Sequence, residues 1–256
     1  TVGSKGSAKI AGVLADGTKV TTASRLILFD GSGPAACVPL FAPLYAKKGW
    51  AGGLLWIDPE TRTVETDRDI RWFIRWDKPG TGLDGFSMLL DACGGFYGTG
   101  ASLAAAYSFT AETDAQYYHP DGAESPVAVP DGVPVAAAGG RMTIAKGAKP
   151  RKVTEEGETW YEYDEANPAS ATLTFASRTG LFKGKFSLCY DYTDSADRLV
   201  HKVVNVPYAG VLTPVRNSGF AELPAGMGHC LVPDNDPAVK AYRLKRSYRI
   251  WLDDAP

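Results

Sequence analysis

The sequence predicts an all-β fold with two related lobes, each a small antiparallel barrel or sandwich, and with little helix. Three observations support this prediction. The 256 residues include 28 Gly and 17 Pro, and 11% are aromatic, a mixture typical of many short strands joined by tight turns. Segments in which polar and apolar residues alternate recur along the chain. Hydrophobic residues make up 45% of the sequence, which is enough for two cores in lobes of about 100 to 130 residues.

The first half of the chain reads as a series of strands and turns. Alternating segments at residues 8–14 and 18–24 flank Asp16-Gly17, and this arrangement predicts a β-hairpin. Residues 87–93 or 101–107 are rich in Ala or Leu and are compatible with a helical turn. Further strands are expected at residues 25–29, 37–45, 50–57 and 71–76.

The second half resumes this pattern after a different kind of segment. Residues 119–150 combine recurrent Pro with Gly pairs, which predicts either a flexible linker or an ordered crossover between the lobes. The strands expected beyond it span residues 159–163, 171–175, 184–192 and 200–206.

A faint internal repeat predicts that the two lobes are related. In both halves a hairpin is followed by an apolar run with Pro and then by a Gly-rich strand. The matched segments are 1–10 with 179–186, 39–45 with 206–212, and 49–56 with 226–232. The predicted organisation is an N-terminal β lobe at 1–110, a Pro/Gly-rich connection with short strands at 111–158, and a C-terminal β lobe at 159–256.

The overall charge argues against a nucleic-acid partner. The net charge is −2 and the pI about 5.9, whereas nucleic-acid binding usually requires a basic surface. A basic strand near the C-terminus is interpreted as a solvated face or a protected edge, with an anion-binding or acidic-glycan patch as the alternative. Its cations are Lys240, Arg243, Lys245, Arg246 and Arg249. No apolar run approaches the roughly 20 residues of a membrane helix, so we expect no membrane insertion of this segment.

The start of the chain and several short sequence segments indicate an exported protein. The chain starts at Thr1 without Met or a visible signal peptide, as expected for a mature form or a fragment of a longer protein. The residues at 14–18, 39–45, 180–186, 206–212 and 244–248 together resemble β-rich modules of very long exported or surface repeat proteins of some bacteria. The resemblance spans both ends of the chain and is weakest at 110–170. It implies an extracellular, modular protein of a family of unknown function, and it implies no catalytic residues.

Motifs of catalysis and cofactor binding are missing from the sequence. His119, His201 and His229 form no local metal-binding pair, and no Ser lies in a G-x-S-x-G turn. The Gly-rich segment 94–100 lacks the Lys-Ser or Lys-Thr of a phosphate-binding loop. We therefore predict no cofactor, no metal site and no catalytic residue.

Acidic residues leave two alternatives open. Those at 155–165 surround Trp160, and Asp67 and Asp69 precede Trp72; we interpret them as solvated turns and strand faces. A glycosidase pair would need two carboxylates about 5 to 9.5 Å apart. A calcium site would need loop oxygens, for which the candidates are Asp191, Asp194, Asp197, Asp234 and Asp236.

Tryptophans are the most suggestive ligand-binding residues. Trp72 and Trp76 are four residues apart and share a face of their predicted strand, close to Arg71, Arg75 and Asp77. Sugar rings stack on flat, exposed aromatic faces. The predicted carbohydrate-binding residues are Trp72, Trp76, Trp50 and Trp160. The alternative is that these indoles fill the core, because Phe73 and Ile74 place apolar side chains on both faces of the strand.

The four cysteines allow one disulfide. Cys189 and Cys230 lie in apolar strands and would form a disulfide if those strands were neighbours. Free buried thiols are the alternative for these two and for Cys37 and Cys93, because Cys often serves as a small core residue.

Together these observations predict a non-catalytic exported or cell-surface β module that acts as a structural or adhesive scaffold. Its expected partners are glycans or other surface proteins. The first alternative is a carbohydrate-binding protein with an exposed tryptophan platform, and the second is a polysaccharide-acting enzyme.

Overall fold

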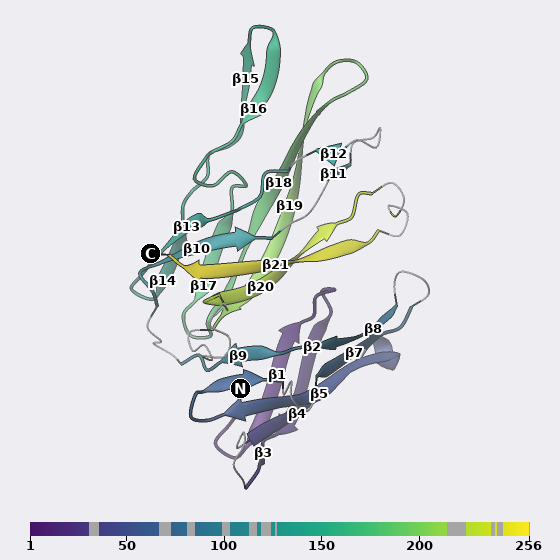
Figure 1. Cartoon of the computed structure of the whole chain (residues 1–256), viewed down its shortest axis with the longest axis vertical. Helices are drawn as coiled ribbons and strands as arrows, with labels where there is room; N and C mark the ends of the chain where they lie inside the picture. Colours follow the sequence, from purple (N-terminus) through teal and green to yellow (C-terminus); the bar gives the residue numbers. More distant parts are fainter. Residues whose placement is uncertain are drawn as a thin grey trace. The chain divides into compact units, whose positions relative to one another are not determined.

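The computed structural model confirms the all-β prediction (Figure 1). The structure describes residues 1–30, 36–66, 73–80, 85–98, 103–112, 117–118, 124–125, 127–213, 224–236, 239 and 243–255. These residues form antiparallel strands and one short 3-10 helix, η1 (Tyr45–Lys47), without any α-helix. None of their helices has the length and hydropathy to cross a bilayer. They divide into two compact units: the described residues of Thr1–Phe96 form unit 1, and those of Tyr97–Pro214 and Pro224–Pro256 form unit 2.

Unit 1 is a hairpin packed on a sheet. The predicted hairpin is confirmed as β1 (Ser7–Val13) and β2 (Lys19–Arg25), joined by a turn in which Gly17 has a φ of +85° that suits glycine. Within the sheet, β4 and β5 are central, and β7 pairs with both β5 and β8. The sheet strands are β3 (Ile27–Leu28), β4 (Ala36–Leu44), β5 (Gly49–Asp58), β6 (Thr63–Glu65), β7 (Ile74–Lys78), β8 (Phe86–Leu90) and β9 (Cys93–Gly95).

The hairpin covers one side of this sheet. Val20 of β2 packs with Leu44, Ala51 and Trp76 in a buried hydrophobic cluster. The Thr22 hydroxyl donates a hydrogen bond of 2.8 Å to the carbonyl oxygen of Phe41 in β4. The side chains of the alternate residues in these strands point to the opposite side of the sheet.

Unit 2 is a nearly closed antiparallel barrel of eight strands (Figure 1). Its strands follow the order β14-β13-β10-β21-β20-β19-β18-β17, and the first and last of them lie close to one another. They are β14 (Arg141–Ile144), β13 (Val133–Ala138), β10 (Ala106–Ala111), β21 (Lys245–Asp254), β20 (Gly226–Pro233), β19 (Leu199–Leu212), β18 (Leu181–Thr193) and β17 (Thr172–Ala176). Two small hairpins accompany the barrel, β11 (Tyr117–Tyr118) with β12 (Glu124–Ser125), and β15 (Arg151–Glu155) with β16 (Glu158–Glu162).

Alternation along the barrel strands fills the interior with side chains. On β18 the buried residues Phe182, Phe186 and Leu188 point inward, while Lys183 and Lys185 are exposed. Each fully buried large apolar side chain contributes about 1.5 to 3 kcal/mol to folding. The barrel therefore encloses a packed core.

The unit boundaries differ from the predicted lobes. Residues 103–110 lie in unit 2 and not in the predicted N-terminal lobe, because β10 pairs with β13 and β21 of the barrel. Residues 133–144 supply the barrel strands β13 and β14, although the sequence predicts a connection there. The two strand pairs of the predicted repeat are each neighbours in a sheet, β4 with β5 and β19 with β20.

Candidate functional site

The four predicted tryptophans lie in different environments. Trp72 is outside the described residues. Trp76 is only 2% exposed, and its indole meets the ring of Phe86 edge-on with centroids 4.6 Å apart. The prediction that Trp76 stacks on a ligand is therefore wrong, because its face of β7 is the one that the hairpin covers. Trp50 is half-buried and Trp160 is 37% exposed.

The registers of the sheet strands bring several residues together on the side of the unit 1 sheet that faces away from the hairpin. Successive strands β4, β5, β7 and β8 align two rows of residues that face away from the hairpin. The exposed large hydrophobic side chains in these rows are Phe41, at 61%, and Leu89, at 62%. We call this surface the open face; its rows are Phe41, Gly52, Arg75 and Leu89, and Pro43, Trp50, Asp77 and Ser87.

The open face combines aromatic rings with an ion pair. The rings of Phe41 and Trp50 have centroids 6.0 Å apart and an interplanar angle of 31°. The guanidinium carbon of Arg75 lies 5.7 Å from the centroid of the Trp50 ring, within reach of a cation–π contact. Arg75 Nε donates to both carboxylate oxygens of Asp77, at 3.0 and 3.3 Å. Apolar ring surface therefore lies directly beside hydrogen-bonding groups.

Gly52 lets the two rings approach the sheet. A Cβ atom at this position would lie 3.2 Å from the Trp50 ring, 3.3 Å from the Phe41 ring and 3.1 Å from the carbonyl oxygen of Leu40. Any larger residue would push one of the rings outward. The glycine thus sets the position of the aromatic pair.

A polar network fixes the sheet beneath the open face. Tyr45 donates a hydrogen bond of 2.7 Å to Asp16 and accepts one of 3.0 Å from the indole nitrogen of Trp76. The Lys78 ammonium lies 3.3 Å from the same carboxylate. Tyr45, Ala46 and Lys47 all have positive φ, between 52° and 68°, which costs roughly 1 to 2 kcal/mol per residue. The network stabilises this turn and joins the hairpin to the sheet.

We expect Asp16→Asn to destabilise unit 1 by about 2 kcal/mol at neutral pH, the usual cost of hydrogen bonds to a charged group. Burial raises the pKa of Asp16, but the hydrogen bonds from Tyr45 and Thr18 and the charge of Lys78 outweigh it, so the pKa lies below its ordinary value. The carboxylate therefore stabilises the fold above about pH 4 and loses this effect as the pH falls through its folded-state pKa.

Guanidinium unfolding at pH 7 and pH 2 measures this effect. The difference between Asp16→Asn and the parent protein should be largest at pH 7 and should shrink at pH 2. Asp253→Asn, at an exposed position of β21, serves as the control and should match the parent at both pH values. A difference that is equally large at both pH values would contradict the assignment.

The sequence pattern does not predict a second polar cluster, which lies where β18 ends and β19 begins. His201 Nδ1 lies 2.7 Å from one carboxylate oxygen of Asp191, and the hydroxyl of Tyr163 donates to the other oxygen at 2.6 Å. The Tyr161 ring stacks on the imidazole with centroids 4.2 Å apart. Burial and the bond to Asp191 raise the pKa of Tyr163 above its ordinary value. The cluster joins the end of the β15–β16 hairpin to the barrel.

The carboxylates proposed for calcium do not converge. Asp191 is bound by His201 and Tyr163, whereas Asp194 binds Arg198 at 2.7 Å. The Arg198 side chain and backbone, with the Ala196 backbone, lower the pKa of Asp194 to about 2. In the described part of the chain no group of three or more His, Cys, Asp or Glu residues is placed to hold a metal ion.

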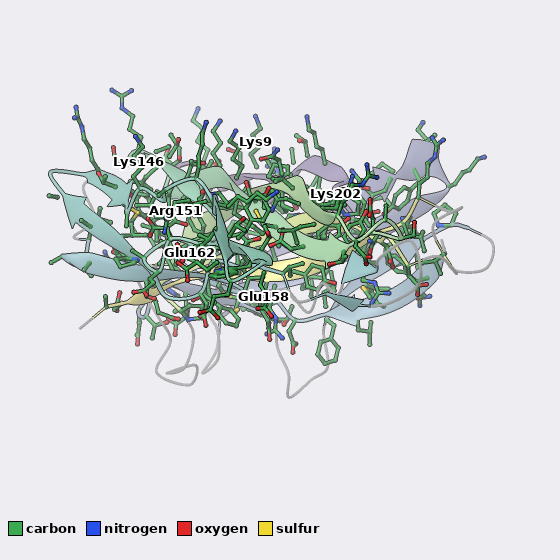
Figure 2. All side chains as sticks on the ribbon, turned by 90° about the horizontal axis from the view of Figure 1, so that it is seen from above. Lys9, Lys146, Arg151, Glu158, Glu162 and Lys202 are labelled. Atoms are coloured by element: carbon green, nitrogen blue, oxygen red, sulfur yellow. The ribbon has the colours of Figure 1, made fainter. Side chains whose placement is uncertain are left out.

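The acidic segment around Trp160 forms the exposed β15–β16 hairpin. Arg151 and Glu162 face one another across it with a nitrogen–oxygen distance of 2.6 Å (Figure 2). Trp160 pairs with the buried Val153 on the neighbouring strand. Of the predicted platform residues, Trp160 is thus exposed without a ring contact to the described residues, and Trp50 is the partly exposed one that has an aromatic partner, Phe41.

The predicted disulfide is not formed, and Cys189 and Cys230 are free buried thiols. Their strands, β18 and β20, are separated by β19, on which Cys189 is opposite Val203 and Cys230 is opposite Tyr208. Burial raises the pKa of Cys189 to about 11 and that of Cys230 to about 12, as expected for unreactive core thiols.

The basic C-terminal strand is partly neutralised by ion pairs. Arg246 Nε lies 2.7 Å from Asp234, and Arg249 Nε lies 3.3 Å from Glu112. Lys240 is outside the described residues. The pairs favour the interpretation of a solvated strand face over a free anion-binding patch.

Phe41 could not be recognised as a site residue from the sequence. It stands in an apolar run in which both alternating sets of residues are hydrophobic, so the pattern marks no exposed face.

Comparisons with models of protein families, with curated proteins and with solved structures found no match to this chain.

Proposed function

We propose that this protein is a non-catalytic β module that binds carbohydrate through the open face of unit 1. The observation that carries the proposal is the pair of rings from exposed Phe41 and half-buried Trp50 beside the Arg75–Asp77 ion pair. The C–H faces of sugar rings pack on aromatic rings, and their hydroxyls require donors and acceptors at the edge of the stack.

The polar groups on the open face suit sugar hydroxyls. Arg75 uses Nε for Asp77, and its two terminal nitrogens make no hydrogen bond or ion pair with the described residues. A guanidinium offers five N–H donors and a carboxylate has about four acceptor positions. Vicinal hydroxyls, each both donor and acceptor, match this combination.

The face is also ordered before any ligand arrives. Gly52 seats the rings against the sheet, and the Asp16–Tyr45–Trp76 network holds the strands beneath them. Little conformational entropy is then lost on binding, which favours affinity at a small surface.

Titration of intrinsic tryptophan fluorescence with a panel of neutral plant and mucin-type polysaccharides tests the proposal. We expect saturable binding that Trp50→Ala weakens about tenfold or more, because a central aromatic contact is worth more than about 1.4 kcal/mol. Phe41→Ala should have a similar effect. Trp160→Ala, which removes an exposed indole from the other unit, is the matched control and should retain binding.

Two outcomes would overturn the proposal. The first is the absence of saturable change across the panel together with resistance of the emission to iodide quenching; it would leave the structural or adhesive scaffold as the better function. The second is release of reducing ends from a bound polysaccharide, which would favour the polysaccharide-acting enzyme. The resemblance to modules of exported repeat proteins supports an extracellular or cell-surface setting for either binding role.

A further inference from the structure

The outward side of the β1–β2 hairpin carries a row of cations. Alternation along the two strands turns Ala8 and Val20 toward the sheet, where they are buried, and leaves every residue of the other set exposed. We call this exposed set the cationic face; its paired residues are Ser7 with Arg25, Lys9 with Ala23, Ala11 with Thr21, and Val13 with Lys19.

None of the described residues neutralises the charges of the cationic face. Lys9, Lys19 and Arg25 make no ion pair or side-chain hydrogen bond with the described residues. Asp16 is the single acidic residue among the first 25 residues, and it is engaged by Tyr45 and Lys78. This face therefore differs from the basic strand β21, whose Arg246 and Arg249 pair with carboxylates. A positive potential extends from it into solvent.

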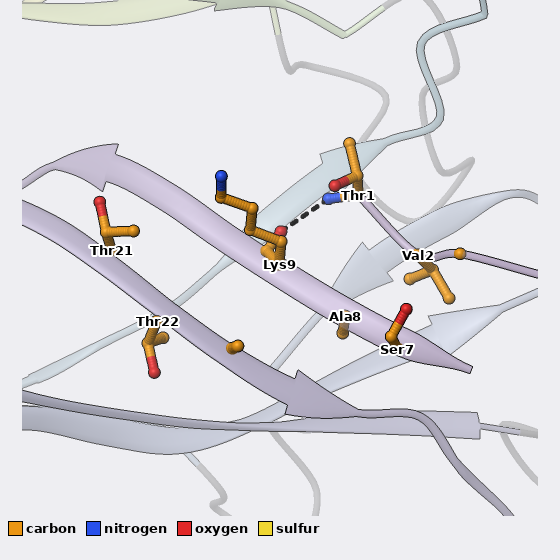
Figure 3. Close-up of a pocket in the computed structure, with 9 residues that line it drawn as sticks. Thr1, Val2, Ser7, Ala8, Lys9, Thr21 and Thr22 are labelled. Atoms are coloured by element: carbon orange, nitrogen blue, oxygen red, sulfur yellow. Dashed lines mark hydrogen bonds between the residues drawn. The ribbon is translucent and has the colours of Figure 1, made fainter. Parts of the chain in front are cut away.

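The shape of the cationic face suits an extended ligand. Small residues at positions 11 and 23 leave its middle flat, and an open pocket of about 520 Å³ is lined by residues of the hairpin and of the segment Thr1–Gly3, which pairs with β1. In Figure 3 the side chains of Ser7, Lys9 and Thr21 point to one side of the hairpin, and those of Ala8 and Thr22 to the other. Rows of a β-strand face repeat about every 7 Å, so the three cations span about 20 Å.

The hairpin is held rigidly enough to present this row. Its turn is bound to the sheet through Asp16, Tyr45 and Lys78, and its second strand through the hydrogen bond from Thr22 to Phe41. Charges that are fixed in spacing favour ligands with regularly spaced counter-charges.

We propose that the cationic face binds the carboxylate or sulfate groups of an acidic polysaccharide. Lys9, Lys19 and Arg25 pair with successive anionic groups, and the hydroxyls of Ser7 and Thr21 bind sugar oxygens between them. The face lies on the opposite side of the sheet from Trp50, so this binding does not depend on the open face. Nucleic acid fits less well, because the protein has a net charge of −2 and the described cationic face offers no aromatic ring for base stacking.

The test compares the parent protein with two charge-matched variants. One combines Lys9→Gln, Lys19→Gln and Arg25→Gln. The other combines Arg178→Gln, Lys183→Gln and Lys185→Gln, at exposed positions of unit 2. Binding is measured by isothermal titration calorimetry with dextran sulfate, alginate and uncharged dextran. Circular dichroism shows whether each variant is folded, which we expect because all six positions are exposed.

We expect the parent protein to bind at least one of the two charged polymers and uncharged dextran at least tenfold more weakly. The hairpin variant should lose at least tenfold in affinity, while the unit 2 variant should lose less than twofold. Rising NaCl concentration should weaken binding by the parent protein and should affect the hairpin variant less. Whether alginate or dextran sulfate binds more tightly distinguishes carboxylate from sulfate as the preferred group.

Three results would overturn the proposal. An equal loss in the two variants would indicate unspecific attraction to net charge. Equal affinity for uncharged dextran and dextran sulfate would show that charge is not recognised. Tighter binding of a single-stranded DNA oligonucleotide than of either charged polymer would identify a nucleic-acid surface instead. Trp50→Ala separates this site from the open face, because it should weaken neutral glycan binding and leave dextran sulfate binding intact.

Discussion

Gly184→Ala is expected to lower the free energy of unfolding of unit 2 by about 3 kcal/mol, at the upper end of the cost of overpacking a core. Gly184 lies in β18 between β17 and β19. A Cβ atom there would overlap the carbonyl oxygen of Thr172 and lie 2.7 Å from the hydroxyl of Tyr208. These two atoms share a partly buried hydrogen bond of 2.8 Å. The added methyl group therefore displaces the backbone at Thr172 and also breaks that hydrogen bond.

Guanidinium unfolding followed by circular dichroism measures this loss. Gly94→Ala is the matched control, because Gly94 also lies in a strand but has no atom within 4 Å of its missing Cβ. That variant should be neutral or slightly more stable, since alanine loses less backbone entropy than glycine on folding. Unfolding of Gly184→Ala at the same denaturant concentration as the parent protein would refute the predicted clash.

Asn167→Asp is expected to cost about 3 to 5 kcal/mol at neutral pH, the range for an uncompensated buried charge. Asn167 is fully buried, and its side-chain nitrogen donates to the carbonyl oxygens of Ala145 and Ala171, at 2.7 and 3.0 Å. Its side-chain oxygen accepts from the Ala171 N–H at 2.7 Å. Ala145 directly follows β14 and Ala171 directly precedes β17. The amide thus joins the two strands at which the barrel nearly closes.

Aspartate keeps the size of the side chain but turns two attractive contacts into repulsion between oxygens. Burial and these carbonyls favour the protonated acid, so the stability difference from the parent should shrink as the pH falls toward 4. Thermal unfolding across this pH range measures it. Asn205→Asp, at an exposed position of β19, is the control and should stay within about 0.5 kcal/mol of the parent protein. A pH-independent loss for Asn167→Asp would point to a packing defect instead.

The local sequence pattern was sufficient to predict the hairpin at the start of the chain. Alternating residues on both sides of Asp16-Gly17 specify a tight turn and a register, and the observed strands Ser7–Val13 and Lys19–Arg25 follow it. The same register places Lys9, Lys19 and Arg25 on one face. The all-β fold was predictable for the same reason, because period-two alternation and turn residues are properties of short segments.

The alternation pattern alone did not predict which side chains are buried where both faces of a strand are apolar. Trp76 and Arg75 are neighbours in β7, and only the hairpin packed above the sheet decides that Trp76 is buried. Phe41, Trp50 and Arg75 come from three strands and meet because the registers of β4, β5 and β7 align them. A sequence shows which residues share a face of one strand, but it does not show which face another element will cover.

The division into units and the state of the cysteines depended on pairing between distant segments. Tyr107 is opposite Asp254, so β10 enters the barrel beside the last strand of the chain instead of ending the first lobe. Insertion of β19 between β18 and β20 separates Cys189 from Cys230. The choice of neighbouring strand is made by the packing of the whole barrel core, to which each strand adds only a few side chains, and this cooperative selection leaves no mark in the composition or periodicity of any single segment.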